Sequence, residues 1–310
     1  MAFVVKKAKR ERIFTKVGLI GPSGGGKTYS ALRLATGMAN EIQNETGKEA
    51  RILMLNTEQS RGQYYANEFD YDIIDMEPPH NPERYVEAID FAVDNGYKIL
   101  IIDSSSHEWE GEGGCLDLQR QAGSTYQAWA KISPRHQRFV DAIANSPIHI
   151  IATMRGKDMY EMTQDEKGKK SIQKLGVGAK QRDNFEYEFT VTFLLDQKTN
   201  IAEQQKDNTH IFTGRSGVIL SEEHGKKIIQ WANSGEGYTP RARQADENPV
   251  EDLASVKKEI ISLCTEAGGS KNADLMNLLK NHVASGNPNA IKSIDKAKEC
   301  LEDIKKFLGR

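Results

Sequence analysis

The sequence feature that most constrains the fold is a glycine-rich loop between an apolar run and an amphipathic segment. The loop reads GPSGGGKT at residues 21–28 and fits the phosphate-binding pattern G-x-x-x-x-G-K-[ST]. Residues 17–20 before it are apolar and partly β-branched, which predicts a strand, and apolar residues recur at roughly helical spacing over residues 28–38. Glycines let the backbone N–H groups converge on phosphate oxygens, and the N-terminus of a helix adds partial positive charge. The stretch therefore predicts a strand–loop–helix unit that binds a nucleoside triphosphate, with a glycine-rich turn that binds nothing as the alternative.

We expect the whole loop and the residue after it to contact the nucleotide. These residues are Gly21, Pro22, Ser23, Gly24, Gly25, Gly26, Lys27, Thr28 and Tyr29. In a P-loop the lysine reaches the β- and γ-phosphates and the following hydroxyl binds Mg²⁺, which are the roles predicted for Lys27 and Thr28.

A second element is expected to hold the metal ion. Residues 98–102 form an apolar run that ends at Asp103, as in a parallel strand buried on both faces. The last residue of such a strand lies at the carboxyl edge of the sheet, where open α/β folds bind ligands. Asp103 is therefore predicted to hold Mg²⁺, in the manner of a Walker B acid, and an ordinary aspartate at the end of a strand is the alternative.

Composition limits the class of protein. The chain has 310 residues, 38% of them hydrophobic and 28% charged, with a net charge of −2, so no overall basic field attracts nucleic acid. Its cysteines, Cys115, Cys264 and Cys300, are far apart and form no CxxC pair, which favours reduced thiols over disulfides or a zinc site. No apolar run reaches transmembrane length, and the basic N-terminal segment lacks the apolar core of a signal peptide. We expect a cytoplasmic protein that does not enter a membrane.

Predicted strands and helices alternate from about residue 13 to residue 233, which indicates an α/β domain with a mostly parallel sheet. The predicted strands cover 13–20, 51–56, 72–75, 98–103, 148–153, 187–195 and 209–213, with a further one at 217–220. The predicted helices cover 27–43, 60–68, 81–95, 125–145 and 222–233. The alternating pattern near residue 190 and a hairpin-like segment at 195–213 indicate an antiparallel extension at one edge of the sheet.

The remaining sequence predicts a second, smaller domain. Residues 234–250 are polar and contain Gly and Pro, as a linker does. Residues 251–310 contain three helical segments, near 250–267, 271–284 and 288–308, and three amphipathic helices can bury a small core. The predicted organisation is a P-loop domain at 1–233, a linker at 234–250 and a helical domain at 251–310. The lysines of the helical domain are interleaved with acids, which is typical of solvated helix faces.

The strand after the P-loop helix carries the candidate for catalysis. It reads RILMLNTE at residues 51–58 and ends in an acid. A carboxylate beside the Walker B strand can accept a proton and hold a water molecule in line with the γ-phosphate. Glu58 is our candidate for this role, and the alternatives are a solvated Glu58 that opens a helix, or Glu108 as the catalytic acid. His107 has no Cys or His partner at ligand spacing, so the sequence does not predict a metal site there.

At this point the chain resembles a known group, the RecA-like nucleotide-binding proteins of bacteriophages, which includes the Sak-type single-strand annealing ATPases. The resemblance covers about residues 13–233 and is carried by GPSGGGKTYSAL, ILMLNTEQSRG, ILIIDSSSHEWE, HIIATMRGKDMY and QRDNFEYEFTVTFLLD. It implies a RecA-like P-loop fold, ATP and Mg²⁺ as ligands, and Glu58 as the catalytic carboxylate. It also implies that Thr153 and Arg155 lie where such proteins sense the γ-phosphate, with a DNA-facing base as the alternative for Arg155.

Proteins of this group bind single-stranded DNA through loops that leave the strand ends. Residues 104–124 and 155–186 are the corresponding segments here. The first is acidic and contains Trp109, whereas the second contains Tyr160 among many basic residues, and a single strand can use cations for its phosphates and rings for its bases. We predict DNA contacts by Lys157, Lys169, Lys170 and Lys174, with a charged, solvated β-hairpin as the alternative. Lys180 and Arg182 are predicted to act in trans on the γ-phosphate of a neighbouring subunit, since an arginine finger accelerates such transfers by about 10³-fold or more.

The sequence thus favours an ATPase that acts on single-stranded DNA in phage recombination or annealing. It would hydrolyse ATP to ADP and phosphate in the host cytoplasm as a homo-oligomer, with the helical domain as a tether to DNA or to a single-strand-binding protein. The alternatives are a replication accessory ATPase, such as a helicase loader that acts mainly through a protein partner, and a kinase. No acceptor-recognition motif supports the kinase.

Overall fold

The structure is a computed structural model that describes residues 5, 7–164, 170–214, 216–237, 253–268, 272–283, 285–291 and 293–308. The chain divides into two compact units, Met1–Arg241 and Ala242–Arg310. Most of the predicted linker, from residue 238 to residue 250, lies outside the described residues. No helix in the described part of the chain combines the length and the apolarity needed to cross a bilayer.

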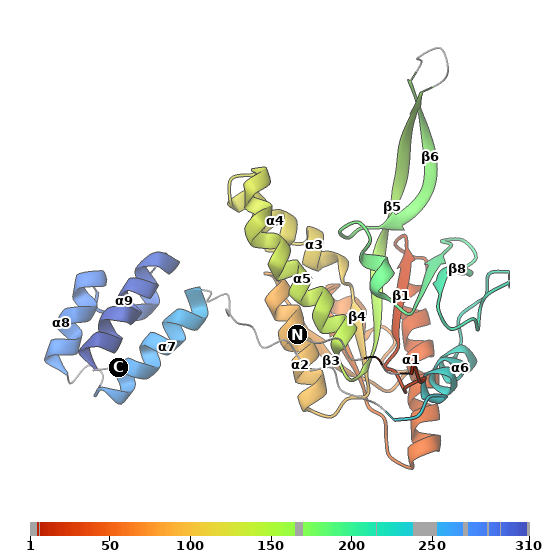
Figure 1. Cartoon of the computed structure of the whole chain (residues 1–310), viewed down its shortest axis with the longest axis horizontal. Helices are drawn as coiled ribbons and strands as arrows, with labels where there is room; N and C mark the ends of the chain where they lie inside the picture. The colour runs from red at the N-terminus through yellow and green to blue at the C-terminus, as the bar shows by residue number, and fades with distance from the viewer. Residues whose placement is uncertain are drawn as a thin grey trace. The chain divides into compact units, whose positions relative to one another are not determined.

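The first unit is built on a mostly parallel sheet of eight strands, and this confirms the predicted α/β fold (Figure 1). The strands are β1 (Lys16–Gly21), β2 (Ile52–Asn56), β3 (Asp72–Asp75), β4 (Ile99–Asp103), β5 (His149–Gln164), β6 (Lys170–Ala179), β7 (Val191–Leu195) and β8 (Ala202–Asp207). Their order is β3-β2-β4-β5-β1-β7-β8, and β6 pairs with β5. The pairs β7–β8 and β5–β6 are antiparallel, so the predicted antiparallel extension lies at one edge, beyond β7.

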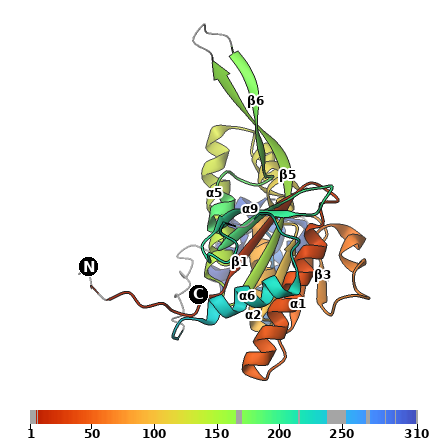
Figure 2. The same cartoon turned by 90° about the vertical axis from the view of Figure 1, so that its right-hand side faces the viewer.

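Helices cover both faces of this sheet, as expected for strands that are apolar throughout. They are α1 (Lys27–Thr46), α2 (Pro82–Asp94), α3 (Ser106–Glu110), α4 (Cys115–Gln121), α5 (Trp129–Asn145) and α6 (Glu222–Asn233). Side chains alternate along each strand, so Ile99 and Ile101 of β4 pack in the core with α1 and α6, whereas Leu100 and Ile102 pack in the core with α2 and α5. Figure 2 shows α5 and α1 on opposite sides of the strands.

Helices α1 and α6 cross at two glycines. A Cβ atom on Gly37 of α1 would lie 1.9 Å from the backbone oxygen of Glu222, and one on Gly225 of α6 would lie 2.1 Å from the backbone oxygen of Leu34. Real Cβ atoms do not approach backbone this closely, so each position accepts only glycine without a shift of one helix. The crossing holds the helix that follows the P-loop against its neighbour.

A buried lysine begins β1. The Lys16 ammonium donates to the Ser146 backbone oxygen at 2.9 Å, to Ser146 Oγ at 2.8 Å and to the Ile148 oxygen at 2.6 Å. Burial lowers the pKa of Lys16 from its ordinary value to about 7. These bonds join the start of β1 to the turn between α5 and β5.

Three segments differ from the sequence prediction. Residues 209–213 form a turn and no strand, because the Asp207 carboxylate accepts hydrogen bonds from Thr209 N at 2.8 Å and Phe212 N at 2.9 Å; the preceding β8 is the strand that pairs with β7. The predicted helix at 60–68 is reduced to the 3₁₀ turn η1 (Gln59–Gln63). The segment 104–124, expected to be a loop, contains α3 and α4. The segment 155–186 contains the β5–β6 hairpin, which projects from the sheet (Figure 1) and matches the charged β-hairpin that was the alternative to a DNA-binding loop.

The second unit has its own apolar core. Its helices are α7 (Leu253–Glu266), α8 (Ala273–His282) and α9 (Ile294–Phe307), with the 3₁₀ turn η5 (Pro288–Ala290) before the last. Ile260, Leu275 and Ile304, one from each helix, are completely buried. Three helices are present where the sequence predicts three, and the last begins later than expected, after the turn at Pro288.

Candidate functional site

The site lies where four neighbouring parallel strands end. The strands β2, β4, β5 and β1 are adjacent in that order. Asn56 of β2 pairs with Asp103 of β4, and Arg155 of β5 pairs with Gly21 of β1. Their carboxyl ends therefore bring the P-loop to the same edge as the other predicted site residues, as expected of an open α/β sheet.

The P-loop has the shape of an anion-binding loop. Gly24 and Gly26 have φ values of 79° and 77°, in the left-handed region that glycine adopts without strain. Helix α1 begins at Lys27 with no acidic residue in its first turn and no side-chain cap, so its first N–H groups remain for an anion. Lys27 Nζ donates to the Pro22 oxygen at 2.8 Å. Burial lowers the pKa of Lys27, while the nearby Asp103 and Glu58 raise it.

Asp103 is a buried carboxylate that two threonines hold in place. Thr28 Oγ1 donates to Asp103 Oδ2 at 2.6 Å and Thr153 Oγ1 donates to Asp103 Oδ1 at 2.5 Å. Burial raises the pKa of Asp103, against the two hydroxyl donors, which lower it. A hydroxyl and a carboxylate that meet beside the phosphate loop are the hard oxygen ligands that Mg²⁺ prefers, so these residues fit the predicted ion. Thr153 is fully buried and contacts Asp103 directly.

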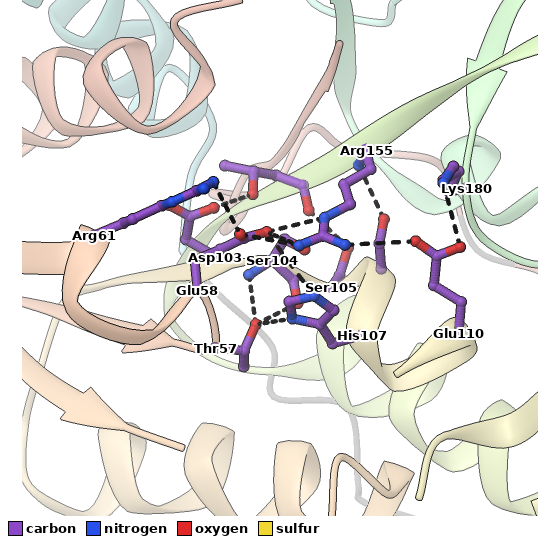
Figure 3. A network of polar contacts seen from close by, with 12 residues as sticks. Thr57, Glu58, Arg61, Asp103, Ser104, Ser105, His107, Glu110, Arg155 and Lys180 are labelled. Carbon is purple, nitrogen blue, oxygen red and sulfur yellow. Dashed lines mark hydrogen bonds and ion pairs between the residues drawn. The ribbon is translucent and has the colours of Figure 1, made fainter. Parts of the chain in front are cut away.

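Glu58 lies beside the P-loop cavity in an ion pair with Arg155 (Figure 3). Arg155 Nη2 donates to Glu58 Oε1 at 2.8 Å and to Oε2 at 3.0 Å, and Arg155 Nε donates to Oε1 at 3.0 Å. The Glu58 side chain is 16% exposed, and its backbone N–H donates to Asn56 Oδ1 at 3.0 Å. The last bond fixes the turn at which the chain leaves β2, and so aims Glu58 toward the same edge as Asp103.

Longer polar contacts, most of them ionic, surround this pair. Arg61 Nη1 lies 3.7 Å from Glu58 Oε2, and His107 Nε2 lies 4.0 Å from Glu58 Oε1. On the other side Glu110 lies 3.8 Å from Arg155 Nη1 and 3.6 Å from Lys180 Nζ. We call this group the Glu58 cluster, made of Glu58, Arg61, His107, Glu110, Arg155 and Lys180. Its ionic contacts beyond the Glu58–Arg155 pair are long and partly exposed, so an incoming ligand can displace them at small cost.

His107 joins the Glu58 cluster to the strand ends. Its Nδ1 lies 2.7 Å from Thr57 Oγ1, which also accepts from Ser104 N at 2.9 Å. Its ring stacks on that of His80 at 5.2 Å between centroids. Burial lowers the pKa of His107, and Arg155 lowers it further, so the ring is neutral near pH 7.

A cavity of about 740 Å³ lies at this edge of the sheet. Of the predicted site residues, most of the P-loop borders it, together with Tyr29, Glu58, Asp103, Arg155 and Lys180. The fully buried Glu108, the alternative catalytic acid, does not border it. Tyr29 is partly exposed and packs against Tyr65 and Phe69 at 5.3 Å between centroids.

The sequence did not point to the far wall of this cavity. The turn between β7 and β8 places Asn200 beside the P-loop, such that a Cβ on Gly26 would lie 3.1 Å from Asn200 Oδ1. In the same turn Gln197 Nε2 donates to the Ser23 oxygen at 2.9 Å, and the exposed Ile219 borders the cavity farther along the chain. The sequence after β7 indicates a turn, but it does not indicate that this turn lies against the P-loop.

The other predicted residues lie elsewhere or are not described. Arg182 and Lys157 border a separate groove near the base of the β5–β6 hairpin, and Lys157 Nζ lies 3.9 Å from Asp183 Oδ1. Lys170 and Lys174 are on β6, where their side chains are outside the described part of the structure, and Lys169 lies outside the described residues.

Comparison with known protein families identifies a match in the first unit. The model of the AAA domain family matches residues 13–227, which contain the P-loop and all the site residues above. A search of curated proteins finds no match.

Proposed function

The chain belongs to the AAA domain family, and from this premise we propose that it is a Mg²⁺-dependent ATPase that binds single-stranded DNA and promotes annealing or recombination. Membership of the family indicates a nucleotide-binding ATPase domain. The observation that carries the reaction is the position of Glu58, whose carboxylate borders the same cavity as Lys27, Thr28 and Asp103. The DNA substrate, the oligomer and the phage setting come from the resemblance to phage annealing ATPases.

The residues of the cavity divide the work of hydrolysis. The N–H groups at the start of α1 and the Lys27 ammonium hold the phosphates. Mg²⁺ held near Thr28 and Asp103 would neutralise charge on the phosphate oxygens. Glu58 takes a proton from the attacking water, whose oxygen bonds to the γ-phosphorus as the bond from that phosphorus to the bridging oxygen breaks. The products are ADP and inorganic phosphate.

The Glu58–Arg155 pair sets a condition on this reaction. Both oxygens of Glu58 accept hydrogen bonds from Arg155, so the arginine occupies the positions from which the carboxylate would contact a water molecule. A γ-phosphate offers Arg155 a partner of higher charge and the same bidentate geometry. We propose that the terminal phosphate draws Arg155 away and frees Glu58 for the water, so that nucleotide binding itself prepares the base.

The hairpin β5–β6 supports the DNA part of the proposal. It begins directly after Arg155, and Lys180 at its end donates its backbone N–H to the Arg155 oxygen at 2.6 Å. A movement of the Arg155 backbone would therefore be transmitted directly to the base of the hairpin. Subunits that meet through this face would let Lys180 or Arg182 reach a neighbouring nucleotide, and the helical unit would serve to recruit a partner such as a single-strand-binding protein.

The test is ATP turnover with and without single-stranded DNA for wild type, Lys27→Ala and Glu58→Gln. We expect Lys27→Ala to lose nucleotide binding, and Glu58→Gln to bind ATP normally while turnover falls by about 10³-fold. Glu87→Gln, which changes an exposed acid of α2, is the matched control and should behave as wild type.

The outcomes separate the alternatives. Stimulation of wild-type turnover by single-stranded DNA supports the proposal. Turnover that ignores DNA but responds to a replicative helicase would point instead to an accessory ATPase that acts through a protein. Normal turnover by Glu58→Gln would remove Glu58 as the base.

A further inference from the structure

A second groove, separate from the nucleotide cavity, gathers three aromatic side chains beside two cations. It has a volume of about 760 Å³ and lies between the α3–α5 region and the base of the β5–β6 hairpin. One wall holds Trp109 of α3, Tyr126 of the 3₁₀ turn η2 (Tyr126–Ala128) and Trp129 of α5, and the other holds Lys157 and Arg182. We call it the tryptophan groove. In Figure 1, α5 lies against one face of the sheet and the hairpin projects beyond the upper end of the sheet.

The aromatic wall is arranged for stacking. Trp109 and Trp129 stack with their ring centroids 5.4 Å apart and their planes 18° apart. Tyr126 is 89% exposed, although a ring of this size gains free energy when it is buried. Single exposed rings are common, but an exposed tyrosine next to a stacked tryptophan pair in one groove offers successive flat surfaces to a ligand with flat rings.

The opposite wall supplies charge. Arg182 is exposed, and Lys157 lies 3.9 Å from the carboxylate of Asp183, which is itself 86% exposed. Such a long, solvated pair is weak, so a phosphate can replace Asp183 as the partner of Lys157. Glu188 also borders the groove, which limits its charge and favours a ligand held by stacking as well as by its phosphates.

Buried hydrogen bonds hold the two walls in a fixed relation. Gln181 Nε2 donates to the Ser105 oxygen and to Glu108 Oε2, both at 3.0 Å, while Gln181 Oε1 accepts from Arg182 N at 2.8 Å. Glu108 also accepts from Cys115 Sγ at 3.1 Å and lies 3.0 Å from His136 Nδ1.

We call Glu108, Cys115, His136 and Gln181 the Glu108 network. It joins the helix of Trp109, the helix of Trp129 and the backbone of Arg182 through side chains that are almost completely buried. The groove is therefore preorganised, which reduces the entropy lost when a flexible ligand binds.

We infer that the tryptophan groove binds single-stranded nucleic acid, with bases stacked on Tyr126 and Trp129 and phosphates held by Arg182 and Lys157. Rings on one wall and cations on the other match the alternation of bases and phosphates along one strand, and stacking tolerates any base. The inference rests on the proposed function and places the DNA contact at the base of the hairpin and on η2, not on the hairpin lysines alone. A protein segment is the competing occupant that the experiment must exclude.

The experiment measures binding of a fluorescein-labelled oligo-dT of about 30 nucleotides by anisotropy, with the full chain and ATP at low salt. Tyr126→Ala should weaken binding about tenfold, and Tyr126→Phe, which keeps the ring, should bind within about twofold of wild type. Arg182→Ala should reduce the slope of log K against log salt by about 0.7, the value for one phosphate contact on a single strand. Phe91→Ala, which removes an exposed ring from α2, is the control and should not change binding.

A second readout comes from the tryptophans. Stacked bases should quench the emission of Trp109 and Trp129, and this quenching should fall in Tyr126→Ala at equal DNA concentration. Binding by Tyr126→Ala and Arg182→Ala that equals wild type would overturn the groove assignment and leave the proposed function in place. A wild-type protein that binds no oligo-dT would defeat the proposed function itself. Loss of DNA binding that is equal in Tyr126→Phe and Tyr126→Ala would also overturn the inference, because stacking would then not be the cause.

Discussion

The Glu58 cluster and the Glu108 network lie on two sides of the short helix α3, and each surrounds a glutamate carboxylate. The two carboxylates differ in their exposure and in the charge of their partners. Glu58 keeps 16% of its side chain exposed and lies between two arginines, with Arg155 at 2.8–3.0 Å and Arg61 at 3.7 Å, while the neutral ring of His107 lies 4.0 Å away. Glu108 is completely buried, and thiol, imidazole and amide groups bond it at 3.0–3.1 Å. Ion pairs that are partly exposed can be exchanged for contacts to a ligand, whereas hydrogen bonds inside a core are costly to break.

The difference indicates that one side of α3 can rearrange when a nucleotide binds, while the other side stays fixed in the core. His107 and Glu110 of α3 contribute to the Glu58 cluster (Figure 3). Glu108, between them in the sequence, is completely buried. Rearrangement around a nucleotide can then occur on one side of α3 while the other side keeps the tryptophan groove in shape. Four predictions test this contrast, from the largest expected effect to the smallest.

Removal of Glu108 should cost the most stability. Glu108→Ala should lower the free energy of unfolding by about 3–5 kcal/mol, because the buried Cys115 thiol, the His136 ring and one N–H of Gln181 lose their acceptor. Chemical denaturation measures the loss. Glu110→Ala is the matched control and should lose less than about 1 kcal/mol, since its ion pairs are long and partly exposed. Glu108→Gln, which keeps an acceptor oxygen, should fall between them, and equal losses for Glu108→Ala and Glu110→Ala would contradict the contrast.

Removal of Arg155 should affect turnover and leave stability nearly unchanged. Arg155→Ala should lower the rate of ATP hydrolysis about 100-fold, equal to about 2.7 kcal/mol, because the γ-phosphate loses a cation. The melting temperature should stay close to that of wild type, and Arg120→Ala, an exposed arginine of α4, should change neither quantity. A rise in turnover would show that Arg155 only restrains Glu58.

A third buried charge extends the contrast to pH. The Lys16 ammonium contacts three oxygens, all from backbone or hydroxyl groups, and its pKa is lowered to about 7. Above pH 7 the unfolded chain holds a proton that the folded chain has lost, so stability should rise with pH, by about 2 kcal/mol between pH 7 and pH 9. Unfolding measured across this range should show the slope in wild type and lack it in Lys16→Met. A slope that survives the substitution would assign it to another group.

The smallest effect should come from a chelator. Glu108, Cys115 and His136 have the atom types of a metal site, and their ligand atoms lie within 4.8 Å of one another. Their hydrogen bonds already satisfy the carboxylate, and burial raises the pKa of the Cys115 thiol, which disfavours the thiolate that a metal needs. Chelation should therefore leave the melting temperature unchanged, and metal analysis should find well under one ion per chain. Stoichiometric zinc together with a lower melting temperature after chelation would make the Glu108 network a metal centre.

The sequence predicted correctly those elements whose structure depends on a short stretch of residues. The strand–loop–helix unit around Lys27 and the buried strand that ends at Asp103 are features of short stretches, and the sheet order then brings them together. The position of Glu58 also followed from a strand end, although its role stays a prediction. The 209–213 strand was wrong because the Asp207 carboxylate satisfies the turn's N–H groups, a competition that periodicity does not register.

Features assembled from distant segments could not be predicted. The Glu108 network draws on residues 108, 115, 136 and 181, whose hydrogen bonds depend on the packing of α3, α4 and α5. Tyr126 in the sequence is only the beginning of a helical pattern, and its exposure appears once the elements around it are placed. For the segment 155–186 the sequence left a DNA-binding loop and a charged β-hairpin open, and its backbone pairs as β5 and β6.

The two glycines at which α1 and α6 cross can help to identify homologues of this chain. A library that samples every amino acid at each position, selected for function, should return only glycine at Gly37 and Gly225, because any side chain there would strike the backbone of the other helix. Phosphate loops recur in unrelated proteins. A pair of glycines nearly 190 positions apart, at which two helices cross too closely for any side chain, is much less common. That pair is the better diagnostic for a genome search.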